Sequence, residues 1–102
     1  MSTLIQILLP LYDNEGHAFG EDVFGKVQRE LTERFGGLTA FTRAPAQGLW
    51  KAEGKTRHDE IVVFEVMADA LDASWWRDYR RVLEREFRQD AIVIRAQDVT
   101  ML

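Results

Sequence analysis

The hydrophobic positions repeat with a period of two in some segments of the chain and with a helical period in others. In residues 3–9, Ile5, Ile7 and Leu9 fall on one face of an extended chain, and a second apolar set that includes Leu8 falls on the other. This alternation predicts a first strand with apolar side chains on both faces.

The same period predicts three further strands. Residues 38–43 and 48–51 form the second strand, 56–67 the third and 91–96 the fourth. Pro45 has no amide hydrogen to donate to a neighbouring strand, so it indicates a break in the second strand, with a bulge or a sheet edge at that point. The second and third strands together form a long hairpin.

Two segments show the spacing of an amphipathic helix. Residues 20–35 carry one apolar stripe, and Gly36–Gly37 supplies a left-handed stop after it. A second helix starts at Asp69 or Asp72, either of which can cap it, and runs to about residue 89. The two stripes consist of Val23, Phe24, Val27, Leu31 and Phe35 in the first helix and of Trp76, Tyr79, Leu83 and Phe87 in the second.

The order strand, helix, hairpin, helix, strand predicts a single α+β domain over residues 1–102, with ferredoxin-like βαββαβ topology (an alpha-beta plait). Right-handed crossovers give an antiparallel sheet of strand order 4-1-3-2 with both helices on one face. No helix then covers the other face, which is apolar, and a monomer rarely exposes a large apolar surface. We therefore expect a homodimer that buries this face by pairing through it, as in a dimeric alpha-beta barrel. The residues assigned to this face are Leu4, Leu8, Leu38, Ile61, Val63 and Val93.

Composition narrows the cellular setting. With 102 residues, 46% of them hydrophobic and 29% charged, the chain is typical of one globular domain. It has no cysteine, which favours a reducing compartment, and its apolar start is too short to cross a membrane. The net charge of −4 argues against nucleic acid as a partner. We therefore expect a cytoplasmic protein that binds neither nucleic acid nor membranes.

The predicted topology gathers chemically active residues at one end of the sheet. The loop over residues 10–19, the hairpin over residues 44–59 and the junction around residues 88–90 meet there, and they carry His17, His58 and Trp50. Histidine near carboxylates is typical of acid–base or metal chemistry, although long surface loops also collect polar residues without any function. The sequence contains no metal-ligand spacing and no phosphate-binding loop, so neither a metal nor a cofactor is expected.

Polar residues also interrupt the apolar sheet face. Gln6, Glu65 and Arg95 lie on three strands that are expected to be neighbours. The second strand adds either Arg43 or Thr42, because the bulge at Pro45 leaves open which of them points to this face. A few polar groups within an apolar surface are typical of a small-ligand site. The alternative is a buried network at a dimer interface, in which Gln6 bridges the two charged residues.

Three short stretches of the chain have a recognisable pattern, namely RFGGLT at residues 34–39, GLW at residues 48–50 followed by Gly54, and FRQDAIVI at residues 87–94. Together they resemble a family of short uncharacterised bacterial proteins of predicted ferredoxin-like fold. The polar run at residues 57–60 departs from the pattern of that family. The resemblance implies the fold and a bacterial source, and it supplies no activity.

Together these observations favour a homodimeric module that binds a small ligand or acts as an accessory protein, without catalysis. The alternative is a cofactor-independent enzyme of the dimeric α+β barrel type, whose pocket on the sheet face uses Glu65 and Arg95, with His58 as an optional third residue. The sequence contains no nucleophile motif, metal spacing or phosphate cradle, and this favours the first hypothesis.

Overall fold

The computed structural model describes the backbone of residues 1–52 and 55–102, and the side chains of the same residues except 43–48, 50–52 and 55–59. Its elements are β1 (Ser2–Pro10), α1 (Glu21–Phe35), β2 (Thr39–Ala52), β3 (Lys55–Ala68), α2 (Ala73–Glu86) and β4 (Val93–Val99).

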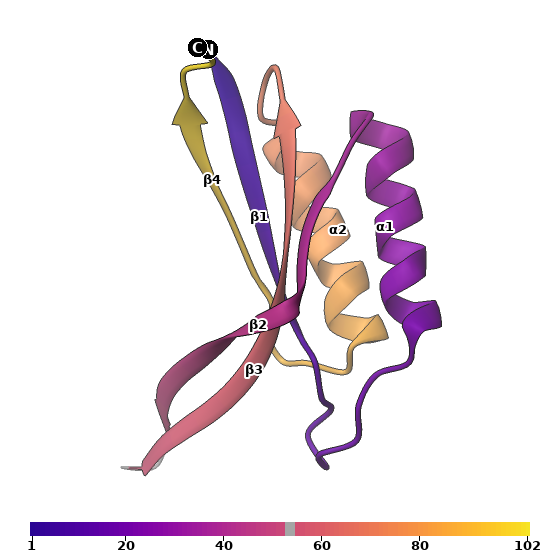
Figure 1. Cartoon of the computed structure of the whole chain (residues 1–102), viewed down its shortest axis with the longest axis vertical. Helices are drawn as coiled ribbons and strands as arrows, with labels where there is room; N and C mark the ends of the chain where they lie inside the picture. The colour runs from indigo at the N-terminus through magenta and orange to yellow at the C-terminus, as the bar shows by residue number, and fades with distance from the viewer. Residues whose placement is uncertain (53–54) are drawn as a thin grey trace.

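The four strands form one antiparallel sheet, and both helices lie on the same face of it (Figure 1). The strand order is β2-β3-β1-β4, which is the predicted order 4-1-3-2 read from the other edge. The ferredoxin-like α+β fold is therefore confirmed. Ser2 pairs with Val99, so the two ends of the chain lie together at one end of the sheet (Figure 1). Neither α1 nor α2, with 15 and 14 residues, has the length and apolar composition of a membrane-spanning helix.

The second strand runs without interruption, so the predicted break in it is wrong. The irregularity expected around Pro45 is confirmed, because the pairing of β2 with β3 shifts register between Phe41 and Ala46. A register shift accommodates the missing proline amide while the strand continues on both sides of it.

The second helix and the last strand also differ from their predicted limits. α2 ends at Glu86, because Arg88 takes a left-handed conformation with φ of 51°. β4 starts at Val93 and extends to Val99, past the predicted end at residue 96. Its polar second half pairs with the start of β1, and only the presence of that neighbour defines it as a strand.

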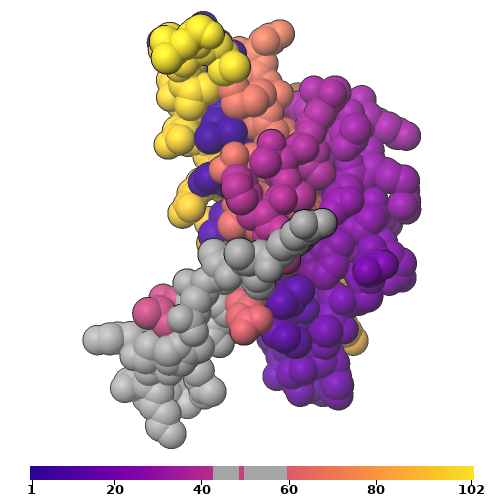
Figure 2. Space-filling view, viewed as in Figure 1, coloured from indigo at the N-terminus to yellow at the C-terminus, as the bar shows by residue number. Residues whose placement is uncertain are grey.

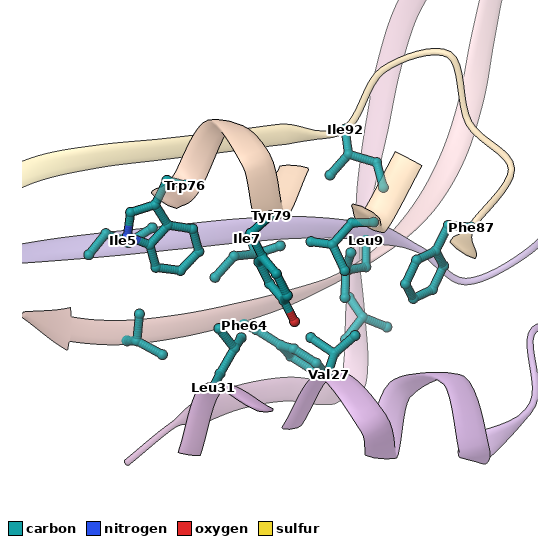
Figure 3. Close-up of a cluster of buried hydrophobic side chains, with 13 residues drawn as sticks. Ile5, Ile7, Leu9, Val27, Leu31, Phe64, Trp76, Tyr79, Phe87 and Ile92 are labelled. Carbon is teal, nitrogen blue, oxygen red and sulfur yellow. The ribbon is translucent and has the colours of Figure 1, made fainter. Parts of the chain in front are cut away.

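The core lies between the sheet and the two helices (Figure 3). Ile5, Ile7 and Leu9 on one face of β1 are completely buried, as their alternation predicted. Side chains from β3 and both helices surround them, namely Val62, Phe64, Val66, Val27, Leu31, Trp76, Tyr79 and Leu83. Phe87 and Ile92, from the segment between α2 and β4, complete the core.

Tyr79 places a buried polar atom in this core. The Tyr79 hydroxyl points towards α1 (Figure 3) and has no hydrogen-bond partner among the residues whose side chains are described. Burial raises the pKa of Tyr79 far above its ordinary value, and the nearby carboxylate of Glu30 acts in the same direction.

The ends of the helices follow the sequence signals. Gly36 has φ of 79°, and its amide donates to the carbonyl of Thr32 at 2.8 Å, which ends α1. Asp72, rather than Asp69, caps α2, because its carboxylate accepts a hydrogen bond of 3.1 Å from the amide of Trp75.

The hairpin of β2 and β3 continues beyond the rest of the sheet. β1 pairs with β3 as far as Pro10 opposite Ile61, whereas β2 stays paired with β3 down to Ala52 opposite Lys55. The outer part of the hairpin is thus a two-stranded ribbon, which leans away from the helices in Figure 1.

Candidate functional site

The sheet face that points away from both helices, the open face, presents side chains that the fold leaves partly uncovered. In Figure 2, β1 reaches the surface between β4 and β3. Leu4, Gln6 and Leu8, the residues of β1 that point to this side, are half-buried, whereas their neighbours towards the helices are completely buried.

The strand register arranges the central part of the open face in three rows that run across the strands. The middle one, the polar row, consists of Arg95, Gln6, Glu65 and Thr39. On one side lies the Leu8 row, made of Val93, Leu8, Val63 and Phe41. On the other side lies the Leu4 row, made of Gln97, Leu4 and Met67. The open face is therefore a polar line between two largely apolar ones.

Hydrogen bonds tie the polar row together. The Nε atom of Arg95 donates to the amide oxygen of Gln6 at 2.7 Å, and the amide nitrogen of Gln6 donates to a carboxylate oxygen of Glu65 at 2.7 Å. Gln6 thus bridges the two charged residues within a single chain. Because β3 and β4 flank β1, the positive and the negative side chain start from backbones about 10 Å apart.

This row retains unused hydrogen-bonding capacity. Among the described side chains, the hydrogen bonds of Arg95 and Glu65 within the row use one guanidinium nitrogen and one carboxylate oxygen. The two terminal nitrogens of Arg95 and the second oxygen of Glu65 are the groups that a ligand or a partner protein could engage.

The apolar rows are substantially exposed. Phe41 is 49% exposed, Val93 53% and Met67 37%. Phe41 and Met67 were not assigned to this face from the sequence. Met67 lies on it because it pairs with Leu4, and Phe41 lies on it because it pairs with Val63. Leu38 was assigned to it wrongly, because it precedes β2 and packs against the core.

A second group of polar residues lies in the loop between β1 and α1. The carboxylate of Asp13 accepts hydrogen bonds from the amides of His17 and Glu15, at 2.9 and 2.8 Å. The hydrogen bond from His17, together with that from Glu15, lowers the pKa of Asp13 below its ordinary value of 3.8. The His17 ring nitrogen Nδ1 lies 3.6 Å and an Arg88 nitrogen 3.5 Å from the other Asp13 oxygen.

The structure brings together only part of the predicted loop site. The loop meets the end of α2 through Asp13 and Arg88, as the topology predicted. The side chains of His58, Trp50 and Arg43 lie outside the described residues, so their roles stay predictions. By backbone pairing, His58 is opposite Leu49 in the outer hairpin, which Figure 1 shows leaning away from the loop.

Beside the described part of the sheet lie two shallow hollows, neither of which resembles a complete binding site. One of about 380 Å³ lies between α1 and the edge of the sheet, against Leu11, Phe24 and Val62. Another of about 220 Å³ lies beside Glu65 and Met67, at the turn between α1 and β2. Within the described part of the chain, no cluster of three histidine, aspartate or glutamate side chains is suited to hold a metal ion.

Comparison with known proteins gives the fold and nothing narrower. No family model and no curated protein matches the chain, so the resemblance drawn from residues 34–94 stays a prediction. Among solved structures, the divalent cation tolerance protein (Cut A1) from Thermus thermophilus is 12% identical with a TM-score of 0.65, over 99% of this chain and 86% of that one.

A phage SAM lyase in complex with S-methyl-5'-thioadenosine is also 12% identical, with a TM-score of 0.64, over 95% of this chain and 81% of that chain. At identities this low, the structural similarity shows a shared ferredoxin-like architecture and nothing more. The strand order and the placement of the helices already indicate that architecture.

Proposed function

We propose that this chain is a non-catalytic binding module that pairs with a second copy through the open face and holds a small ligand against the polar row. The observation that carries the proposal is the hydrogen-bonded trio of Arg95, Gln6 and Glu65 between two apolar rows. Small-ligand sites combine mostly apolar walls with a few fixed polar groups, and the open face has this composition.

The exposed apolar side chains support pairing. Burial of a valine, leucine, phenylalanine or methionine side chain contributes roughly 1.5–3 kcal/mol, and the Leu8 row alone offers Leu8, Val63, Val93 and Phe41. The hollow of about 220 Å³ beside Glu65 is smaller than the roughly 300 Å³ of an ordinary ligand site. A second copy laid over the face supplies the missing wall.

The environment of Glu65 favours binding over catalysis. One of its carboxylate oxygens accepts a hydrogen bond from Gln6, and Arg95 lies at the far side of the same glutamine. A general base has to reach the proton that it removes, and a carboxylate held in a surface network is better suited to orient a ligand.

The cellular setting is part of the same proposal. The lack of cysteine favours a reducing, cytoplasmic environment, and the resemblance of residues 34–94 favours a bacterial source.

The ligand is tested by titrating the isotope-labelled protein with phenylpropionate and with phenethylamine at millimolar concentration. These probes combine an apolar body with a group that Arg95 or Glu65 can bind. We expect amide chemical-shift changes confined to β1, β3 and β4 with at least one probe, and their loss in Gln6→Leu. Changes spread over the helices, or none at all, would refute the ligand part, and a monomeric wild type in sedimentation would refute the pairing.

A further inference from the structure

The polar row is asymmetric about β1. Arg95 lies on β4 on one side of Gln6, and Glu65 lies on β3 on the other side, one strand away in each direction. A face with a cation and an anion at equal distances from a central strand can be complementary to a copy of itself.

We propose that two copies pair about a two-fold axis that runs parallel to β1 over Gln6, so that Arg95 of each copy faces the partner's Glu65. The inference rests on the proposed pairing through the open face, and it specifies the partner and the geometry. In this arrangement β4 of each copy lies over the partner's β3, and the two glutamines meet at the centre.

The charges select this axis over the alternative. Two identical faces that meet have a two-fold axis in the plane between them. If that axis ran across the strands, Arg95 would face the partner's Arg95 and Glu65 the partner's Glu65. Like charges opposite each other in an interface are strongly unfavourable, whereas an axis along the strands replaces both repulsions with attractions.

The positions of the apolar rows are compatible with a two-fold axis along β1. An axis along β1 keeps each residue at its own height on the strands, so Leu8 faces the partner's Leu8 and Val63 faces the partner's Val93. Facing sheets lie about 10 Å apart, and long side chains from both sides span that distance. The hydrogen bonds within the row leave both terminal nitrogens of Arg95 and the second oxygen of Glu65 unused. One of these nitrogens then forms the ion pair with the partner's Glu65, and the other is left for the ligand of the proposed function.

The test uses charge reversal at the two ends of the row. Arg95→Glu and Glu65→Arg each create two like-charge contacts per dimer, and we expect each to weaken dimerisation at least about tenfold in sedimentation equilibrium. The double variant, and an equimolar mixture of the two single variants, restore opposite charges at every contact and should return to wild-type affinity. The amide of Gln6 both donates and accepts, so either reversed side chain keeps a hydrogen-bonding partner within its own chain.

Asp98→Arg is the matched control. Asp98 lies on β4 but pairs with the buried Thr3, so it points to the helix side of the sheet, and its reversal should leave the affinity unchanged. Single variants that dimerise as well as wild type, or a mixture that stays monomeric, would overturn the inference while the pairing itself stands. A monomeric wild type would overturn the pairing and this inference together.

Discussion

Substitution of Val63 by lysine tests whether the open face drives self-association. Val63 lies in the middle of the Leu8 row, opposite Leu8 on one side and Phe41 on the other. It is half-buried in the single chain, so a lysine there can extend its ammonium group into water. We therefore expect the isolated subunit to fold, with a loss of less than about 1 kcal/mol.

The dimer is affected far more strongly, because pairing buries two lysines at once. In the proposed arrangement each one faces the partner's Val93, which offers no counter-charge. An unpaired buried charge costs several kcal/mol, and taking about 3 kcal/mol for each lysine gives roughly 6 kcal/mol for the dimer. At 1.4 kcal/mol per tenfold change, the dissociation constant should rise by roughly four orders of magnitude.

Sedimentation velocity over a concentration series measures this change directly. The control is Thr32→Lys, which adds the same charge at an exposed position on α1 and should sediment like wild type. Circular dichroism and urea unfolding confirm that both variants are folded. If the lysine variant at position 63 keeps the wild-type dissociation constant, the open face is not the association surface.

Three further predictions concern stability. Tyr79→Phe removes a buried hydroxyl that has no hydrogen-bond partner among the described side chains. The free energy of unfolding should therefore stay constant or rise by up to about 1 kcal/mol. A fall of more than about 1 kcal/mol would mean that the hydroxyl does have a partner. Gly36→Ala should lower the free energy of unfolding in urea by about 1–2 kcal/mol, because φ is 79° at this position. Gly37→Ala should lower it little, because the new methyl group meets open space and φ is not positive. Equal losses in the two variants would contradict this reasoning. The lowered pKa of Asp13 means that its carboxylate stabilises the fold above the pKa of the unfolded chain, and that this contribution disappears as the pH falls through the lower folded value. Asp13→Ala should therefore reduce the loss of stability between about pH 5 and pH 2, and an unchanged pH profile would exclude this role.

The alternation in β1 and the stripes in the helices were sufficient to predict the topology. Ile5, Ile7 and Leu9 have the two-residue period of a strand. The apolar stripe of the first helix includes the odd spacings from Phe24 to Val27 and Leu31, which fit a helix and not one face of a strand. These patterns arise locally, because one face of each element is buried. The limits of β4 could not be found in this way, since its polar residues become a strand only beside β1.

The polar row was predictable for the same reason as the sheet. Once β1 lies between β3 and β4, the two-residue period places Gln6, Glu65 and Arg95 on one face. The position of Phe41 was not predictable, because the register shift near Pro45 sets which residues of β2 lie opposite β3. The proximity of His17 to Asp13 follows from turn geometry within one loop, and the sequence indicated only that the two residues are near each other.

The pairing of Ser2 with Val99 makes the chain a suitable scaffold for cyclisation. Neighbouring strands lie about 4.8 Å apart, so a short glycine-rich peptide that joins residue 102 to residue 1 would convert β4 and β1 into a hairpin. New ends could then be opened at Glu15–Gly16, in the exposed loop before α1, to give a circularly permuted protein with the same layers. Closing the ring would also connect the end of β4 covalently to the strand beside it, β1.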